Sequence, residues 1–254
     1  MKTQSRKITL GTKEWADSNV NCYFGCSNNC RYCYAKKMAI RFKRKTESDW
    51  KIMIPNQKAI EKGYNKRKGR IMFPTSHDIT IESLDGCLKV LKKLLDTDNE
   101  ILITSKPKFS CIKIICDEFS QKKDLIQFRF TITSLNNELL SFWEPNAPSF
   151  DERLKSLEYA YSRGYKTSIS IEPFLDENPY PLVDTLIPYV TESIWIGKMN
   201  YIKAENLLSE EKTYFESIRR INYKNNLITI NKIADRYSNH FIRIKDSIHN
   251  YLSS

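Results

Sequence analysis

The sequence predicts an α/β fold in which parallel β-strands alternate with helices. Short runs rich in β-branched and aromatic residues recur along the 254-residue chain, and Pro, Gly, Asn or Asp bound most of them, as is typical of strands. Helical patterns separate these runs, and parallel neighbours need such crossover connections. About six strand–helix units fit this length, fewer than the roughly eight of a closed barrel. The alternatives are therefore a partial barrel and an open wound sheet.

Strands are expected wherever an apolar run lies between turn-forming residues. These runs are RIMFP (70–74), EILITS (100–105), LIQFRFTITS (125–134), KTSISIEP (166–173) and SIWIG (193–197). LITI (227–230) and HFIRI (240–244) are expected to add pairing segments near the end.

Two segments carry the clearest helical patterns. In residues 81–96, leucines recur at helical spacing and leave lysines on the other face: Leu84, Leu88, Leu91 and Leu95. In residues 149–164, Ser149 and Glu152 predict a capping box and Gly164 predicts the helix end. The apolar stripe of this second helix is expected to be Leu154, Leu157 and Tyr161.

Composition predicts one domain over residues 1–254, with a basic helical insertion at about 36–68. The net charge is +11, and basic residues concentrate in 36–45 and 62–70. A phosphate-bearing partner explains such runs physically; a solvated lysine-rich face is the alternative. There is no apolar run like the roughly 7–15 residues of a signal peptide or the roughly 18 of a membrane span. We therefore expect a cytoplasmic protein.

Polar residues follow several of the predicted strands, where parallel α/β folds place their functional groups. They are Thr75-Ser76-His77-Asp78, Ser105-Lys106, Thr133-Ser134, Glu172 and Lys198 to Asn200. Each has a structural alternative: His77 and Asp78 could cap a helix after Thr80, and Glu172 could serve as an ion-pair partner.

Three cysteines lie within eight residues in GCSNNCRYCYA (25–35), among turn-forming residues that disfavour a helix. Of the other four cysteines, three sit among apolar residues and are expected to be buried core thiols. Zinc usually takes four ligands. The chain has only three histidines, at positions 77, 240 and 249, and no second CxxC pair. A zinc site would need a fourth ligand from elsewhere in the chain, so zinc is disfavoured.

The CxxxCxxC spacing resembles the signature of the radical S-adenosylmethionine (SAM) superfamily. This resemblance implies a partial (β/α)6 barrel and a [4Fe–4S] cluster held by Cys26, Cys30 and Cys33, with the fourth iron open to SAM. It further implies reduction by a donor such as flavodoxin or ferredoxin and cleavage of SAM to a 5′-deoxyadenosyl radical. The cofactor then carries the difficult chemistry and the protein positions it.

Within the superfamily, the chain looks most like the spore photoproduct lyase-like, or DNA repair photolyase-like, branch. The matching stretches are GCSNNCRYCYAKKMA (25–39), FPTSHD (73–78) and 144–173. The resemblance implies hydrogen transfer by Tyr32 and Tyr34. Pro74 stands where the lyase has the cysteine that returns hydrogen to the base, which counts against thymine-dimer cleavage by the same mechanism.

The same analogy implies where SAM contacts lie. Ser76 and Asp78 are expected near the amino group, Thr133 and Ser134 near the ribose, and Arg153 near the carboxylate. Glu172 and Lys198 are expected on the substrate side or beside the adenosyl group.

The leading hypothesis is a radical SAM enzyme that abstracts hydrogen from DNA or RNA, in lesion repair or modification. One alternative keeps the radical chemistry and acts on a peptide or small metabolite. The other is a non-catalytic iron–sulfur protein that binds nucleic acid or senses redox state.

Overall fold

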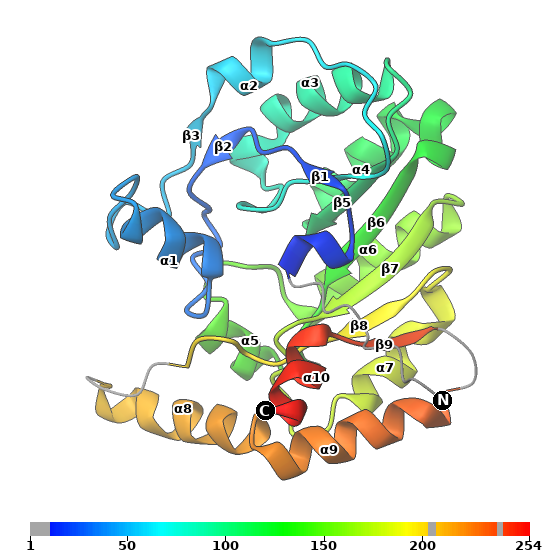
Figure 1. The fold of residues 1–254 in the computed structure, drawn as a ribbon. Helices are drawn as coiled ribbons and strands as arrows, with labels where there is room; N and C mark the ends of the chain where they lie inside the picture. Colours follow the sequence, from blue (N-terminus) through cyan, green and yellow to red (C-terminus); the bar gives the residue numbers. More distant parts are fainter. Residues whose placement is uncertain (1–10, 203–206, 238–240) are drawn as a thin grey trace.

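The predicted parallel α/β architecture is confirmed. The structure is a computed structural model that describes residues 11–202, 207–237 and 241–254. Within these residues a parallel sheet runs in the order β1-β4-β5-β6-β7-β8-β9, and its two edge strands do not pair with each other (Figure 1). Its strands are β1 (Ser18–Asn19), β4 (Ile71–Phe73), β5 (Ile101–Ser105), β6 (Ile126–Thr131), β7 (Lys166–Ile171), β8 (Ile194–Ile196) and β9 (Ile242–Ile244). The sheet is therefore an open, partial barrel.

Helices connect the strands and cover the outside of the sheet. The crossover helices are α3 (Leu84–Leu95), α4 (Phe109–Glu118), α5 (Asn137–Trp143), α6 (Phe150–Ser162) and α7 (Tyr180–Leu186), followed by α8 (Ser209–Ile221), α9 (Lys224–Ile233) and α10 (Asp246–Ser253). Short 3₁₀ turns are η1 (Gly11–Glu14), η2 (Ile81–Ser83), η3 (Ser120–Leu125), η4 (Ile187–Tyr189) and η5 (Ala234–Arg236). No helix in the described part of the chain has the length and apolar character needed to cross a membrane.

The segment predicted as a basic helical insertion is only partly helical. Helix α1 (Tyr34–Arg41) precedes an irregular stretch, strand β3 (Ile54–Pro55) and the short helix α2 (Gln57–Glu61). Strand β3 pairs antiparallel with β2 (Tyr23–Phe24) to form a two-stranded ribbon beside the cysteine loop. The single-domain prediction stays a prediction.

The inner face of the sheet is polar, although both faces are buried. Along β6, Phe128 and Phe130 belong to the hydrophobic core, whereas Arg129 on the opposite face lies against the rings of Trp15 and Trp195 at 4.6 and 5.4 Å. Burial lowers the pKa of Arg129 to about 9. The polar residues that alternate with apolar ones in LIQFRFT therefore face the interior of the barrel and not the solvent.

Two helix predictions need correction. Helix α6 buries Arg153 and Leu157, whereas Tyr161 is 44% exposed. Ser149 caps the helix through the Glu152 amide, but the Glu152 carboxylate bonds to Lys108 and to the Phe109 amide, so only half of the capping box forms. In α3 the predicted Leu91 and Leu95 are buried, whereas Leu84 and Leu88 are only partly covered. The other deeply buried positions are Cys87, Val90 and Leu94.

The predicted strand at 227–230 is wrong, because LITI lies in α9. Leu227 and Ile230 are the buried residues of that helix, one turn apart, so packing on one helical face overrides the β-branched composition. Burial is expected for three of the four remaining cysteines, and in the structure all four, Cys22, Cys87, Cys111 and Cys116, are fully buried.

Candidate active site

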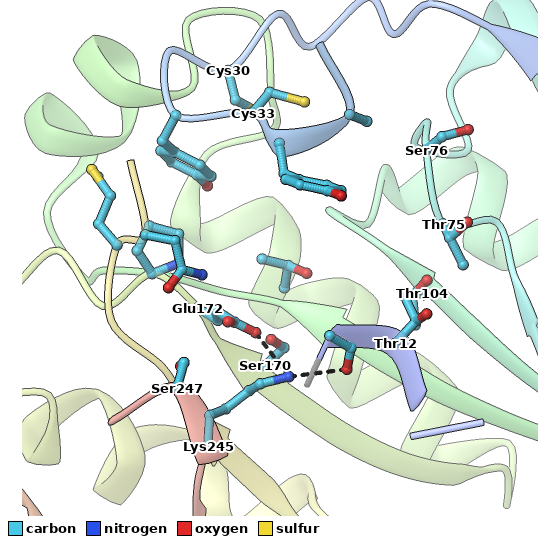
Figure 2. A pocket seen from close by; sticks show the side chains of 18 of the residues that line it. Thr12, Cys30, Cys33, Thr75, Ser76, Thr104, Ser170, Glu172, Lys245 and Ser247 are labelled. Carbon is cyan, nitrogen blue, oxygen red and sulfur yellow. Dashed lines mark hydrogen bonds and ion pairs between the residues drawn. The ribbon is translucent and has the colours of Figure 1, made fainter. Parts of the chain in front are cut away.

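A cavity of about 930 Å³ opens at the carboxyl ends of the strands. Cys30 and Cys33 lie at one end and Glu172, Lys245 and Ser247 at the other (Figure 2). The predicted site residues that line it are Cys26, Cys30, Tyr32, Cys33, Tyr34, Ser76, Asp78, Glu172 and Lys198. The strand-end rule therefore brings together residues from widely separated parts of the chain.

The cysteine loop is irregular up to its last cysteine. Gly25 has φ +87° and lies so close to the ribbon that a Cβ would be 2.5 Å from the Ile52 carbonyl oxygen. The Cys26 amide donates to the Trp50 carbonyl at 3.0 Å. Cys33 is the N-cap of α1, and its sulfur accepts from the Lys36 amide at 3.4 Å. The three cysteines therefore do not form a helical stripe.

The three cysteine thiols are the candidate metal ligands of the site. All three line the cavity, and burial raises the pKa of each. In the described ranges, no group of three or more His, Cys, Asp or Glu side chains is arranged to hold one metal ion. Each thiolate of an iron–sulfur cluster can bind a different iron, so the sulfurs need not converge on one point. Three thiolates would leave one iron of a [4Fe–4S] cluster without a protein ligand.

Asp78 and Lys106 form a partly buried ion pair beside the cysteines. The Asp78 carboxylate accepts from Asn28 Nδ2 at 2.8 Å and from the Lys106 amide at 2.8 Å, and Lys106 Nζ is 3.9 Å away. Burial opposes ionisation, but Lys106 and these hydrogen bonds hold the pKa of Asp78 below its usual value. The strand-end rule predicts Lys106 as a residue of the site, but the sequence does not indicate its contact with Asp78.

Lys106 lies among several acidic groups. Burial opposes its charge, but the acidic groups around it, Cys30 and Tyr32 foremost, raise its pKa well above the ordinary value. Its ammonium lies 5.6 Å from the centre of the Tyr32 ring. The site therefore presents a fixed positive charge next to the cysteines.

Tyr32 is held by a buried ion pair. Its hydroxyl donates to Glu144, and Glu144 pairs with Arg153, with both of these charged side chains fully buried. Thr133 Oγ1 also donates to Glu144, at 2.9 Å. Burial opposes ionisation of Glu144, but Arg153 and then Lys106 outweigh it and lower its pKa.

Three predicted SAM contacts do not reach the cavity. Thr133, Ser134 and Arg153 are absent from its wall and fully buried. Ser134 donates to Asp176 Oδ1 at 2.6 Å. Thr133 and Arg153 both contact Glu144, which accepts the hydrogen bond of the Tyr32 hydroxyl.

The His77 side chain bonds to backbone groups. Its Nε2 is 3.3 Å from the amides of both Cys22 and Tyr23, and its Nδ1 is 3.0 Å from the Asp78 carbonyl. Two amide donors make Nε2 the acceptor and assign the proton to Nδ1. The second histidine considered as a zinc ligand, at position 240, lies outside the described residues.

An ion network closes the far end of the cavity. Lys245 pairs with Glu14 and lies 3.5 Å from Glu172, with its ammonium 4.1 Å from the centre of the Trp15 ring. Burial raises the pKa of Glu172, and Lys245 only partly opposes this. Burial lowers the pKa of the nearby Lys198, and the Glu172 carboxylate partly offsets this lowering.

Aromatic and basic side chains stand at the cavity wall nearest α1. The rings of Tyr34 and Tyr201 stack at 6.2 Å, and both are at least half exposed. Lys37 Nζ lies 4.7 Å from the centre of the Tyr201 ring. A flat ring with an adjacent cation can bind a nucleobase and its phosphate.

Comparison by sequence finds distant, uncharacterized relatives. No known family model matches the chain. An uncharacterized protein of Methanocaldococcus jannaschii is 27% identical over 161 residues, which cover 62% of this chain and 60% of that protein. An uncharacterized protein of Acidianus two-tailed virus is 26% identical over 176 residues, 65% of this chain and 57% of that protein. The matches thus span less than two thirds of these relatives.

Comparison by structure finds characterised proteins. A spore photoproduct lyase mutant with bound AdoMet and dinucleoside spore photoproduct has a TM-score of 0.55 and 16% identity, over 93% of this chain and 79% of the lyase. Streptococcus suis SuiB bound to S-adenosylmethionine has a TM-score of 0.52 and 17% identity, over 90% of this chain and 47% of SuiB. The chain thus has the fold of two radical SAM enzymes, spore photoproduct lyase and SuiB.

Proposed function

We propose that the chain is a radical SAM enzyme whose substrate is a nucleic acid. The observation that carries the proposal is the cavity wall itself. Three cysteines in a CxxxCxxC spacing share one cavity with the ion pair of Asp78 and Lys106. The fold shared with two SAM-binding enzymes supports the same proposal.

Cys26, Cys30 and Cys33 would hold a [4Fe–4S] cluster. When bound, the cluster and SAM would supply one-electron cleavage of the sulfonium to a 5′-deoxyadenosyl radical that abstracts hydrogen. Loading a cluster requires the three cysteines to lose their protons. The ammonium of Lys106 favours that loss, because it lowers the pKa of Cys30 and Cys33 against the effect of burial.

The remaining residues of the site would bind and orient SAM and the substrate. Lys106 offers a cation to the SAM carboxylate, and Asp78 with Ser76 offers acceptors to its amino group. Glu172 and Lys198 line the opposite end, where they would face the adenosyl group or the substrate.

The tyrosines and the buried residues behind them would have different tasks. Tyr32 is held by Glu144, and Tyr34 is exposed at the wall; both are proposed for hydrogen transfer. Arg153 and Thr133 would act by fixing Glu144, and Ser134 by anchoring the loop after β6 through Asp176.

A nucleic-acid substrate is favoured by charge and by the aromatic wall. The chain carries a net charge of +11, and Lys37 and Arg41 of α1 are exposed near the stacked Tyr34 and Tyr201. A lyase with the same fold binds a dinucleoside lesion. Pro74 lines the cavity. The sequence resemblance matches it to a lyase cysteine, so the proposed reaction differs from lyase chemistry at the hydrogen-return step.

A peptide substrate is the second candidate. SuiB has the same fold and has been crystallised with a precursor peptide. The third candidate is a non-catalytic iron–sulfur protein that binds nucleic acid or senses redox state.

Anaerobic reconstitution with iron and sulfide tests the enzyme assignment. The loaded protein, given dithionite and SAM, is expected to form 5′-deoxyadenosine, and Cys30→Ala is expected to lose both the cluster absorbance and the product. Cys116→Ala, a buried cysteine outside the site, is the matched control and should retain both. A loaded protein that forms no 5′-deoxyadenosine would leave the non-catalytic iron–sulfur alternative.

Salt-dependent binding tests the substrate class. Affinity for a DNA or RNA oligonucleotide should fall steeply with salt, and Lys37→Glu with Arg41→Glu should reduce the log–log slope by about 2, roughly one per phosphate contact. The control, Lys89→Glu with Lys224→Glu, makes the same charge change on α3 and α9. Binding that is independent of salt would favour the peptide or metabolite alternative.

A further inference from the structure

The two-stranded ribbon beside the cysteine loop exposes an apolar surface that the cavity does not use. Phe24 and Ile54 are cross-strand partners and are each 48% exposed, and Ile52 is 56% exposed. Cross-strand partners lie side by side. None of the three lines the cavity. We call Phe24, Ile52 and Ile54 the ribbon patch.

The ribbon patch is connected directly to the cysteines. Phe24 is separated from Cys26 by Gly25 alone, and Gly25 packs against the carbonyls of Trp50 and Ile52. The Cys26 amide donates to the Trp50 carbonyl, and the Trp50 side chain is 2% exposed and lines the cavity with Cys26. The patch is therefore the outer surface of the wall that would hold the cluster.

The surroundings of the patch are basic. Lys43 and Arg44 are exposed and directly precede Lys45 in the chain. Lys51 and Lys58 flank the ribbon in sequence and are exposed. Lys45, by contrast, is buried and donates to the Ile52 carbonyl at 3.0 Å, which holds the ribbon against residues 43–45. An apolar centre within a basic rim fits a partner with an apolar centre and an acidic rim.

We propose that the ribbon patch is the docking surface for a small acidic flavin protein that carries one electron. This inference rests on the proposed function, since only a redox cluster behind the wall requires a carrier. One electron passes from the reduced carrier to the cluster, and the carrier leaves oxidised by one electron. Docking on the outer wall brings the carrier near Cys26 and leaves the cavity free for SAM and substrate.

Two reductants separate docking from catalysis. Dithionite is a small ion and needs no docking surface, whereas a reduced flavodoxin does. With the reconstituted holoenzyme and SAM, Phe24→Ser with Ile54→Ser should change dithionite-driven 5′-deoxyadenosine formation by less than about twofold. The flavodoxin-driven rate should fall about tenfold or more, because central apolar contacts dominate such interfaces. Ile114→Ser, which alters an apolar residue of α4 that is 42% exposed, is the control and should affect neither rate.

A charge variant provides an independent measurement. Lys51→Glu with Lys58→Glu should lower the flavodoxin-driven rate at low salt by about tenfold and have less effect at high salt, because rim charges act mainly on association. The dithionite-driven rate should not change.

Several results would overturn the proposal. Equal flavodoxin-driven rates in wild type and in the serine variant would do so. So would a parallel loss of the dithionite-driven rate, which would make the ribbon a support for the cluster loop. Weakened oligonucleotide binding with an unchanged flavodoxin-driven rate would assign the patch to nucleic acid. If wild type forms no 5′-deoxyadenosine even with dithionite, the proposed function itself has failed.

Discussion

At the scale of single residues, Arg153 contacts a partner that no sequence motif marks. The family resemblance implies a place for Arg153 near the SAM carboxylate. In the structure its charge is neutralised by Glu144, a protein carboxylate, and neither side chain is exposed. Glu144 lies in the irregular segment after α5, and no periodic pattern in the sequence links it to Arg153.

Replacing Glu144 by Gln should destabilise the protein strongly. The change leaves the Arg153 guanidinium buried without its counter-charge, which is expected to cost about 3–5 kcal/mol of unfolding free energy. Urea unfolding of the two proteins measures the difference. Asp96→Asn, which breaks the exposed pair with Lys92, is the control and should cost less than about 1 kcal/mol. Similar losses in the two variants would contradict the buried-pair interpretation.

Glu172 should make stability depend on pH. Burial raises its pKa in the folded protein, so the folded state holds this proton more tightly than the unfolded state, whose value is about 4.3. The stability contributed by this group is full below about pH 4.3 and is lost as pH rises through the raised folded pKa. Unfolding free energies measured across this range should fall more steeply with pH in wild type than in Glu172→Gln. Parallel curves would show that Glu172 titrates normally.

At the scale of elements, the cysteine loop depends on its contact with the β2–β3 ribbon. Gly25 has a positive φ, and an added Cβ would meet backbone oxygens. Gly25→Ala should therefore shift the loop, at a cost of about 1–3 kcal/mol, and lower the iron bound per chain after reconstitution. Gly63→Ala, where an added Cβ meets nothing within 4 Å, is the control. Full iron loading of Gly25→Ala would show that the loop tolerates the shift.

The long elements could be predicted from the sequence, and the shortest could not. β5 and β7 follow runs whose β-branched residues are buried on both faces, so composition and structure agree. β1, β2 and β3 have two residues each, too few to show any period. The run at 227–230 is predicted as a strand but forms part of α9, because Leu227 and Ile230 fit one face of a helix as well as they fit a strand.

At the scale of the whole molecule, the two ends of the described chain meet across the open side of the sheet. Lys245 follows β9, and Glu14 comes from η1. Trp15 adds a ring against both Lys245 and Arg129. Sequence reasoning did not find Glu14 or Lys245, because neither belongs to a motif and their contact depends on the final curvature of the sheet. The strand-end residues were found because parallel topology alone brings them to one edge.

The pair between Glu14 and Lys245 should show strong energetic coupling. Lys245→Met leaves Glu14 and Glu172 buried beside each other and should cost about 3–5 kcal/mol. Adding Glu14→Gln removes one of these charges, so the double variant should be more stable than the sum of the single changes predicts. Chemical unfolding of the four proteins gives the coupling energy. Simple additivity would show that the two chain ends are held by packing and not by charge.

The position of Trp50 also gives the protein an optical signal. Its carbonyl holds Cys26 and its indole lines the same cavity wall, so an absorbing cluster at the cysteines would lie close to this fluorophore. Cluster insertion should therefore quench Trp50 emission, and Trp50→Phe should remove that part of the change. The wall between ribbon and cavity thus allows assembly of the proposed site to be followed by fluorescence in real time, without added dye.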